Sequence, residues 1–158
     1  MEKYKLLEYK EENYDKVIAF MQKCLPESGR SFALDSKHKA YQNISDNFLK
    51  FWCMFDGEKL IGTVAVRPLK EKQCELKSLY LYEEYQGLGL GYRMFRLAID
   101  AAKQAGFEEM YLDTISSSSK RAIHLYEHAG FTYTERYKDN PVTDVFMRLN
   151  LLDREERL

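Results

Sequence analysis

The sequence predicts an α/β fold, in which a mixed sheet is flanked by helices. Three observations support this prediction. In the second half of the chain, apolar runs alternate with helical patterns, as expected for strands joined by helices. Both helical patterns end in Ala-Gly-Phe, at Ala105–Phe107 and Ala129–Phe131, and a left-handed glycine followed by an apolar residue often ends a helix. In the first half, Asp56-Gly57 separates two apolar runs, which is a strong hairpin signal.

The first half is predicted to contain three strands, at Tyr4–Tyr9, Lys50–Phe55 and Leu60–Arg67. From Tyr14 onward, apolar residues keep helical spacing until shortly before Pro26, so we expect one helix there. The region Glu27–Leu49 is weakly patterned and predicts a short helix and loops.

The second half is predicted to contain four strands, at Cys74–Tyr82, Glu109–Thr114, Thr132–Tyr137 and Asp144–Leu151. Two helices are expected between them, at Tyr92–Ala105 and Lys120–Ala129. Strands joined by helices form right-handed crossovers, so neighbouring strands here should run parallel. The first helix carries an apolar stripe formed by Met94, Leu97, Ala98, Ala101 and Ala105, and this stripe should face the sheet.

Composition indicates one globular domain, residues 1–158, with 45% hydrophobic and 31% charged residues. A net charge of −1 gives no basic field for a nucleic-acid partner. No apolar run reaches the length of a membrane span, and the N-terminal residues lack the apolar core of a signal peptide. Cys24, Cys53 and Cys74 are far apart and form no metal or disulfide pattern, so we expect a reduced, cytoplasmic protein.

A glycine-rich stretch, Tyr85–Tyr92 (YQGLGLGY), lies where a predicted strand gives way to a helix. Such a turn presents unpaired N–H groups and the positive end of a helix dipole, which together form a site for anions such as phosphate. The glycine spacing fits neither the dinucleotide fingerprint nor a Walker A loop. An alternative is that the glycines only form a tight turn and let the helix pack closely.

Two segments in order resemble the GNAT superfamily of N-acetyltransferases. Gln86–Gly91 is similar to its Q/R-x-x-G-x-G/A motif, and Ala122–Phe131 is similar to its A-x-x-L-Y-E-x-x-G-F segment. The resemblance covers roughly Cys74 to Leu151. It implies a mainly antiparallel sheet with a central pair of parallel strands, Cys74–Tyr82 and Glu109–Thr114, which splay apart to admit acetyl-coenzyme A.

The resemblance also implies which residues hold acetyl-CoA. The pyrophosphate would bind the backbone amides of Gln86, Gly87, Leu88, Gly89, Leu90, Gly91 and Tyr92. The pantetheine arm would pair with the backbone of Leu79, Tyr80 and Leu81. The family often has asparagine where this chain has Ser119, and a serine reaches less far. Ser119 either contacts pantetheine or belongs only to a helix cap.

The implied chemistry is acetyl transfer to a primary amine by direct attack in a ternary complex. Tyr126 matches the family's general acid, which would protonate the departing thiolate. Tyr126 could also be only a core residue. Glu75 resembles the catalytic base of the histone-acetylating branch, and the alternatives are a surface glutamate with no role or a base made of ordered water. Glu83 and Glu84 are expected in a solvated turn, and a backbone N–H near Leu81 is expected to stabilise the oxyanion.

Parts of the sequence also match two other classes of function. His124–His128 matches the zinc-peptidase pattern H-x-x-E-H, but Tyr126 lies about 200° around the helix from either histidine. If Tyr126 faces the sheet, both histidines face solvent, and only His38 remains as a third imidazole. We therefore expect no metal. A non-catalytic acyl-CoA-binding sensor on the same fold would keep the glycine loop, but the presence of Tyr126 favours an enzyme.

The acceptor is expected to be a small-molecule amine or a peptide. In this fold the acceptor cleft is walled by the region after the first helix and by the last hairpin. Here these walls are Glu27–Leu49, with Arg30, Phe32 and Tyr41, and the loop Tyr137–Pro141. Amino acids, polyamines, peptide N-termini and lysines all remain open as acceptors. The resemblance also implies a homodimer, with the last strand as its exposed edge.

Overall fold

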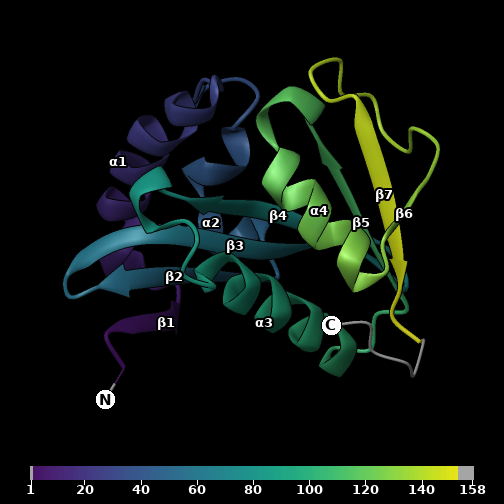
Figure 1. The fold of residues 1–158 in the computed structure, drawn as a ribbon, viewed down its shortest axis with the longest axis horizontal. Helices are drawn as coiled ribbons and strands as arrows, with labels where there is room; N and C mark the ends of the chain where they lie inside the picture. Colours follow the sequence, from purple (N-terminus) through teal and green to yellow (C-terminus); the bar gives the residue numbers. More distant parts are fainter. Residues whose placement is uncertain (1, 153–158) are drawn as a thin grey trace.

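A seven-stranded sheet with the order β1-β2-β3-β4-β5-β7-β6 forms the centre of the computed structural model, which describes residues 2–152 (Figure 1). The strands are β1 (Tyr4–Glu8), β2 (Lys50–Asp56), β3 (Lys59–Lys70), β4 (Gln73–Leu81), β5 (Glu109–Thr114), β6 (Thr132–Tyr133) and β7 (Val145–Asn150). All neighbouring pairs are antiparallel except β4–β5, which is parallel. The predicted mixed α/β architecture is confirmed.

Helices cover both faces of this sheet. The α-helices are α1 (Tyr14–Cys24), α2 (Ile44–Asn47), α3 (Leu90–Gln104) and α4 (Lys120–Ala129). Short 3-10 turns form η1 (Glu11–Asn13), η2 (Leu25–Ser28), η3 (Lys39–Gln42), η4 (Glu83–Tyr85) and η5 (Ser116–Ser118). Figure 1 shows α3 and α4 on the near face and α1 and α2 behind the sheet. No helix in the described part of the chain is long and apolar enough to span a membrane.

The buried side of α3 differs from the predicted stripe. Its buried residues are Leu90, Met94, Phe95, Ala98, Ile99 and Ala102. Leu97 and Ala101 are only partly buried, and Ala105 is exposed. The helix packs on α4 as well as on the sheet, because the Phe95 ring contacts the rings of Tyr126 and Phe131 at 5.6 and 6.0 Å. The second contact turns the buried side toward α4.

Two parallel strand pairs were predicted, β4–β5 and β5–β6, and only β4–β5 is present. Strand β7 lies between β5 and β6 and pairs antiparallel with both. Strand β7 pairs with β5 along its whole length, from Glu109 opposite Asn150 to Thr114 opposite Val145. Strand β6 ends at Tyr133, well short of the predicted Tyr137, because the chain then leaves the sheet. The prediction that the last strand is an exposed edge is therefore wrong, since the edges are β1 and β6.

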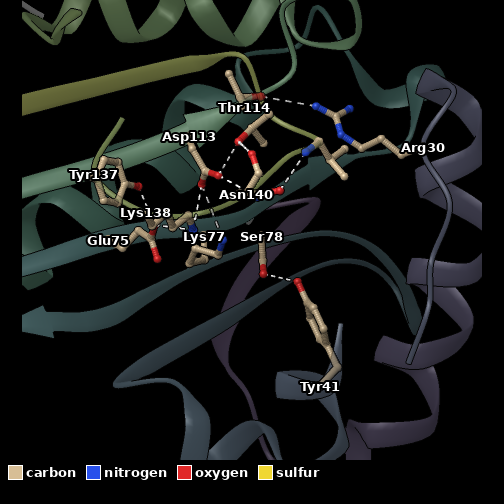
Figure 2. Close-up of polar contacts among 12 residues, drawn as sticks. Arg30, Tyr41, Glu75, Lys77, Ser78, Asp113, Thr114, Tyr137, Lys138 and Asn140 are labelled. Atoms are coloured by element: carbon tan, nitrogen blue, oxygen red, sulfur yellow. Dashed lines mark hydrogen bonds and ion pairs between the residues drawn. The ribbon is translucent and has the colours of Figure 1, made fainter. Parts of the chain in front are cut away.

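Strands β4 and β5 diverge after a short contact, as the resemblance implied. They pair only from Gln73 opposite Glu109 to Glu75 opposite Tyr111. On its other side, β4 has an irregularity opposite Thr63–Ala65 of β3, where Ser78 has a positive φ of 58°. Ser78 is the only non-glycine residue with positive φ in the described chain. The Thr63 hydroxyl donates to the Ser78 carbonyl at 2.7 Å, and the Ser78 hydroxyl shares a hydrogen bond with Tyr41 (Figure 2).

Gly62 of β3 lies where α3 packs closely on the sheet, so a side chain at this position should destabilise the protein. A Cβ there would lie 3.0 Å from the Tyr80 carbonyl oxygen and 3.1 Å from side-chain carbons of Leu81 and Met94. Because a backbone oxygen cannot easily move, Gly62→Ala should lower the free energy of unfolding by about 1–3 kcal/mol in urea denaturation. Gly91→Ala is the control, since a Cβ there meets nothing within 4 Å. It should be neutral or stabilise by up to about 1 kcal/mol, and equal losses would contradict the packing argument.

Candidate functional site

A cleft of about 1470 Å³ opens where β4 and β5 part. Its walls come from five places in the chain: the segment from Cys24 to Phe48, Arg67 of β3, the carboxyl-terminal half of β4, the segment from Glu83 through the glycine loop to the start of α3, and the segment from Leu112 into α4. Residues Asn140, Val142 and Thr143 of the loop between β6 and β7 complete it. The divergence of the parallel pair therefore opens a cleft lined by residues of both motifs.

The glycine loop presents free backbone donors to this cleft. Gly87 and Gly89 have φ of 86° and 81°, a region that favours glycine, and Gly89 is the N-cap of α3. The first helical hydrogen bond runs from the Arg93 N–H to the Gly89 carbonyl at 3.1 Å. Within the described chain, no N–H from Gly87 to Tyr92 makes a backbone hydrogen bond. This helix start therefore has the donors and the dipole of an anion site.

Close packing does not explain these glycines. A Cβ at Gly89 or Gly91 would meet nothing within 4 Å, so the alternative that they admit a closely packed helix is wrong at these two positions. At Gly87 the nearest atom is Nη1 of Arg121, 3.9 Å away. Arg121 also lines the cleft, so its guanidinium adds a cation beside the free N–H groups. Sequence reasoning missed Arg121, because its proximity to the loop depends on how α4 packs.

Most residues predicted to bind the cofactor line the cleft. They are Leu79, Tyr80, Leu81, Gln86, Gly87, Gly89, Gly91, Tyr92 and Ser119. The side chains of Leu88 and Leu90 do not: Leu88 is 57% exposed and Leu90 is in the core. Only their backbones can take part, as the prediction assumed.

Tyr126 has its ring in the core and its hydroxyl at the cleft. The residue is only 6% exposed, and its ring contacts Phe95 and Phe131. Its hydroxyl has no hydrogen-bond partner among the described residues, yet no buried side-chain oxygen there lacks a partner. The hydroxyl must therefore be reached from the cleft, which Tyr126 lines. Burial raises the pKa of this phenol, Tyr80 adds to the effect, and Arg30 opposes it.

Ser119 and Arg30 connect the two sides of the cleft. Nη2 of Arg30 donates to the Ser119 hydroxyl, which also shares a 2.6 Å hydrogen bond with Thr114. The other Arg30 nitrogen, Nη1, donates to Ser28 at 2.6 Å. Arg30 thus reaches from the end of η2 to the start of α4 (Figure 2). Ser119 is buried at the cleft wall, and its hydroxyl is already bonded on both sides.

Glu75 is neither on the surface nor at the cleft. It is 2% exposed, so the alternative of a surface glutamate is wrong, and it is absent from the cleft walls. The Tyr137 hydroxyl donates to its carboxylate at 2.5 Å, and the Lys138 ammonium lies 2.7 Å away (Figure 2). Both donors come from the loop after β6, which explains why that loop leaves the sheet before Tyr137.

Asp113 holds the same loop from β5. Asn140 and Thr143 donate to its Oδ2 at 2.9 Å each, while Lys138 and Lys77 lie 3.1 and 3.8 Å from its Oδ1. Burial alone would raise the pKa of Asp113, but the two ammonium groups and the hydrogen bonds hold it below its ordinary value. The loop is therefore fastened to both diverging strands by buried charge.

The remaining predicted residues are placed as follows. Arg30, Tyr41 and Asn140 line the cleft. Phe32 does not line it but contacts the Tyr41 ring at 5.6 Å. Tyr137 and Lys138 face the buried charges instead. Glu83 and Glu84 are exposed, in agreement with a solvated turn.

The histidine pattern on α4 does not form a metal site. His124 and His128 are exposed while Tyr126 faces inward. His38 lies on the other side of the cleft, where its Nδ1 accepts from the Ala33 N–H at 2.9 Å. Within residues 2–152, no group of three or more His, Cys, Asp or Glu side chains is arranged to hold a metal ion.

Comparison with known proteins identifies the family. The sequence pattern of the acetyltransferase (GNAT) family matches residues 14–131, which is more than half of the chain. The protein belongs to this family.

An uncharacterized N-acetyltransferase of Schizosaccharomyces pombe is 38% identical over 93 residues, 58% of this chain and 56% of the relative. YjgM of Escherichia coli, also an uncharacterized N-acetyltransferase, is 30% identical over 113 residues, 69% of this chain and 66% of YjgM. The chain thus spans less than two thirds of the length of these relatives.

Solved structures agree on the fold. A GNAT-family acetyltransferase of Staphylococcus aureus superimposes with a TM-score of 0.83 at 22% identity, over 94% of this chain and 99% of that one. PaiA N-acetyltransferase of Thermoplasma acidophilum, solved in complex with coenzyme A, gives a TM-score of 0.74 at 19% identity, over 95% and 99%. At these identities the likeness concerns the fold, and it confirms the predicted GNAT-like sheet with its parallel pair.

A charge placed in the glycine loop tests the anion site. Gly89→Asn and Gly89→Asp impose the same backbone strain, because both residues tolerate positive φ to a similar extent. Only the aspartate adds a negative charge where phosphate would lie. We expect coenzyme A to bind Gly89→Asp at least about tenfold more weakly than Gly89→Asn, measured by calorimetry. Equal affinities in two folded variants would contradict the assignment of the loop.

Proposed function

We propose that the protein transfers an acetyl group from acetyl-CoA to a primary amine by direct attack in a ternary complex. The observation that carries this proposal is the convergence of two features on one cleft. The free N–H groups from Gly87 to Tyr92 lie at one end of it, and the hydroxyl of Tyr126 reaches it beside the parted strands. Membership of the GNAT family and the coenzyme A bound to PaiA support the same activity.

The residues fit the parts of acetyl-CoA from end to end. The pyrophosphate would accept hydrogen bonds from the loop amides, with Arg121 supplying a positive charge beside Gly87. The pantetheine amides would pair with the backbone of Leu79 to Leu81, which β5 leaves unpaired after the strands diverge. The Ser119 hydroxyl already forms hydrogen bonds with Arg30 and Thr114. It can contact the pantetheine arm only while sharing these bonds.

The transfer requires one proton to leave the amine and one to reach the thiolate. The amine nitrogen forms a bond to the thioester carbonyl carbon, and the carbon–sulfur bond then breaks. Tyr126 donates its proton to the departing sulfur and recovers one from the nitrogen through water. Burial raises the pKa of Tyr126, and burial in the same cleft would also raise the pKa of the departing thiol. The pKa values of the proton donor and of the leaving group would thus shift in the same direction.

For the base, the geometry favours water over direct transfer to Glu75. Its carboxylate already accepts from Tyr137 and is paired with Lys138, and Glu75 does not line the cleft. A direct role would require the Lys138 contact to open. We therefore propose that water in the cleft relays this proton from the amine nitrogen to Tyr126. An N–H near Leu81 stays the predicted donor to the oxyanion.

Removing the Tyr126 hydroxyl tests the acid. Tyr126→Phe should keep its stability and its coenzyme A affinity, because the hydroxyl has no protein partner to leave unsatisfied. Turnover of acetyl-CoA with an accepted amine should fall by about 10²–10⁴-fold, the usual effect of losing a general acid.

The acetyl donor provides the control. A thioester whose thiol is much more acidic than coenzyme A needs less help in leaving, so the variant should lose far less rate with it. An equal loss with both donors would contradict proton donation. If coenzyme A binds but no amine in a broad panel is acetylated, the protein is a sensor of acyl-CoA rather than an enzyme.

A further inference from the structure

On one wall of the cleft, all the charged side chains are positive. We define the acceptor wall as the cleft-lining residues of the segment 30–48 together with those of β3 and of β4 before Ser78. Every charged side chain on this wall is a cation, namely Arg30, Lys37, Arg67 and Lys77. It also carries His38, whose pKa is lowered to about 4 by burial, by Lys37 and by Lys77. The imidazole is therefore neutral near pH 7.

The carboxylates nearest to this wall, those of Asp113 and Glu75, already have ion-pair and hydrogen-bond partners. Asp113 and Glu75 have side chains only 2% and 3% exposed. Each oxygen of Asp113 faces two donors, and Glu75 is held by Tyr137 and Lys138. An ammonium entering from the acceptor wall would thus meet no free carboxylate.

The other carboxylates that line the cleft lie toward the cofactor. Glu83 precedes the glycine loop, and Glu27 accepts from the Glu83 N–H at 2.9 Å. Glu127, on α4, accepts from Tyr133 at 2.8 Å. Glu27, predicted from the sequence to lie on the acceptor side, is thus held beside the segment that leads into the glycine loop. The acceptor wall as defined here contains no carboxylate to pair with a second ammonium group on the acceptor.

Lys77 is the cation on this wall with the clearest need for an anion. Its side chain is 27% exposed, and its closest ion pair, with Asp113, is 3.8 Å long, because Lys138 approaches the same oxygen to 3.1 Å. Burial lowers the pKa of Lys77, and Glu75 only partly offsets this. An arriving carboxylate would supply a closer counter-charge than the one that Asp113 gives this ammonium.

Neighbouring cations strengthen the same field. In the β3–β4 register, Ala65 lies opposite Lys77 and Arg67 lies opposite Glu75. Arg67 and Lys77 are therefore diagonal neighbours on one face of the sheet. Lys37 and Lys77 both lower the pKa of His38 by their positive charge, and Lys37 lines the same wall from the segment 30–48.

We propose that the acceptor is a small amine that also carries a carboxylate, and that Lys77 pairs with this carboxylate. The inference rests on the proposed acetyl transfer. It disfavours polyamines, which would bring further positive charge to a cationic wall. The same field lowers the pKa of an ammonium bound beside it. A cleft with no free carboxylate base can thereby still present a neutral amine to the thioester.

Matched pairs of amines test the proposal on the unmodified protein. Each pair differs by one carboxylate: phenylalanine with phenethylamine, leucine with isopentylamine, and γ-aminobutyrate with propylamine. With coenzyme A release as the readout, kcat/KM should be at least about tenfold higher for the carboxylate-bearing member of the accepted pair. Spermidine should be a poor acceptor. Equal or better turnover of the decarboxylated members, or of spermidine, would overturn the proposal.

Substitutions then assign the effect to Lys77. Lys77→Met should raise KM for the carboxylate-bearing acceptor at least about tenfold and leave KM for its decarboxylated partner unchanged. Lys77→Arg should retain most of the preference. Lys70→Met removes the same charge from an exposed position of β3 outside the cleft and should behave like the unmodified protein. An unchanged preference in folded Lys77→Met would refute the role of Lys77.

The possible failures can be told apart. If no amine is acetylated although coenzyme A raises the melting temperature, the proposed transferase function fails. If amines are acetylated without regard to a carboxylate, only the present inference fails. If Lys77→Met does not fold, the paired amines on the unmodified protein still decide the acceptor class.

Discussion

The parting of β4 and β5 is the constraint on which the rest of the structure depends. The two strands pair over three residues and then separate, so the backbone groups that the rest of each strand turns toward the gap have no neighbouring strand to satisfy them. The irregularity at Ser78, held by Thr63 and Tyr41, lies in the part of β4 that follows its last pair with β5, at Glu75. Everything that the proposed chemistry needs meets in the gap: free amides, the Tyr126 hydroxyl and a cationic wall.

Local patterns were sufficient for most of the fold and for the cofactor side of the site. The Ala-Gly-Phe helix ends, the Asp56-Gly57 hairpin and the glycine loop each act over a few residues, so the sequence alone reveals them. The insertion of β7 between β5 and β6 was not predictable in this way. It depends on pairing between strands far apart in the chain. The positive φ of Ser78 was also missed, because serine carries no local signal for it.

The acceptor side was harder to predict because its properties come from long-range charge pairing. A run of mixed charges such as Tyr137–Pro141 does not show which of its members will be buried. In the folded chain, Lys138 neutralises Glu75 and Asp113 from a loop more than twenty residues away from either. This pairing removes Glu75 from the cleft and leaves Lys77 loosely paired. A catalytic role for Glu75 inferred from its position in the sequence is thereby weakened, and a cationic acceptor wall emerges that no motif indicated.

The most direct test of this account is amide hydrogen exchange of the full chain with and without saturating coenzyme A. The account predicts slower exchange at the N–H groups from Gly87 to Tyr92 and along Leu79–Leu81, because the cofactor would satisfy donors that the protein leaves free. The start of α1, which faces no part of the cleft, should be unchanged. Saturating binding with no protection in either segment would contradict the claim that the parted strands and the glycine loop form the coenzyme A site.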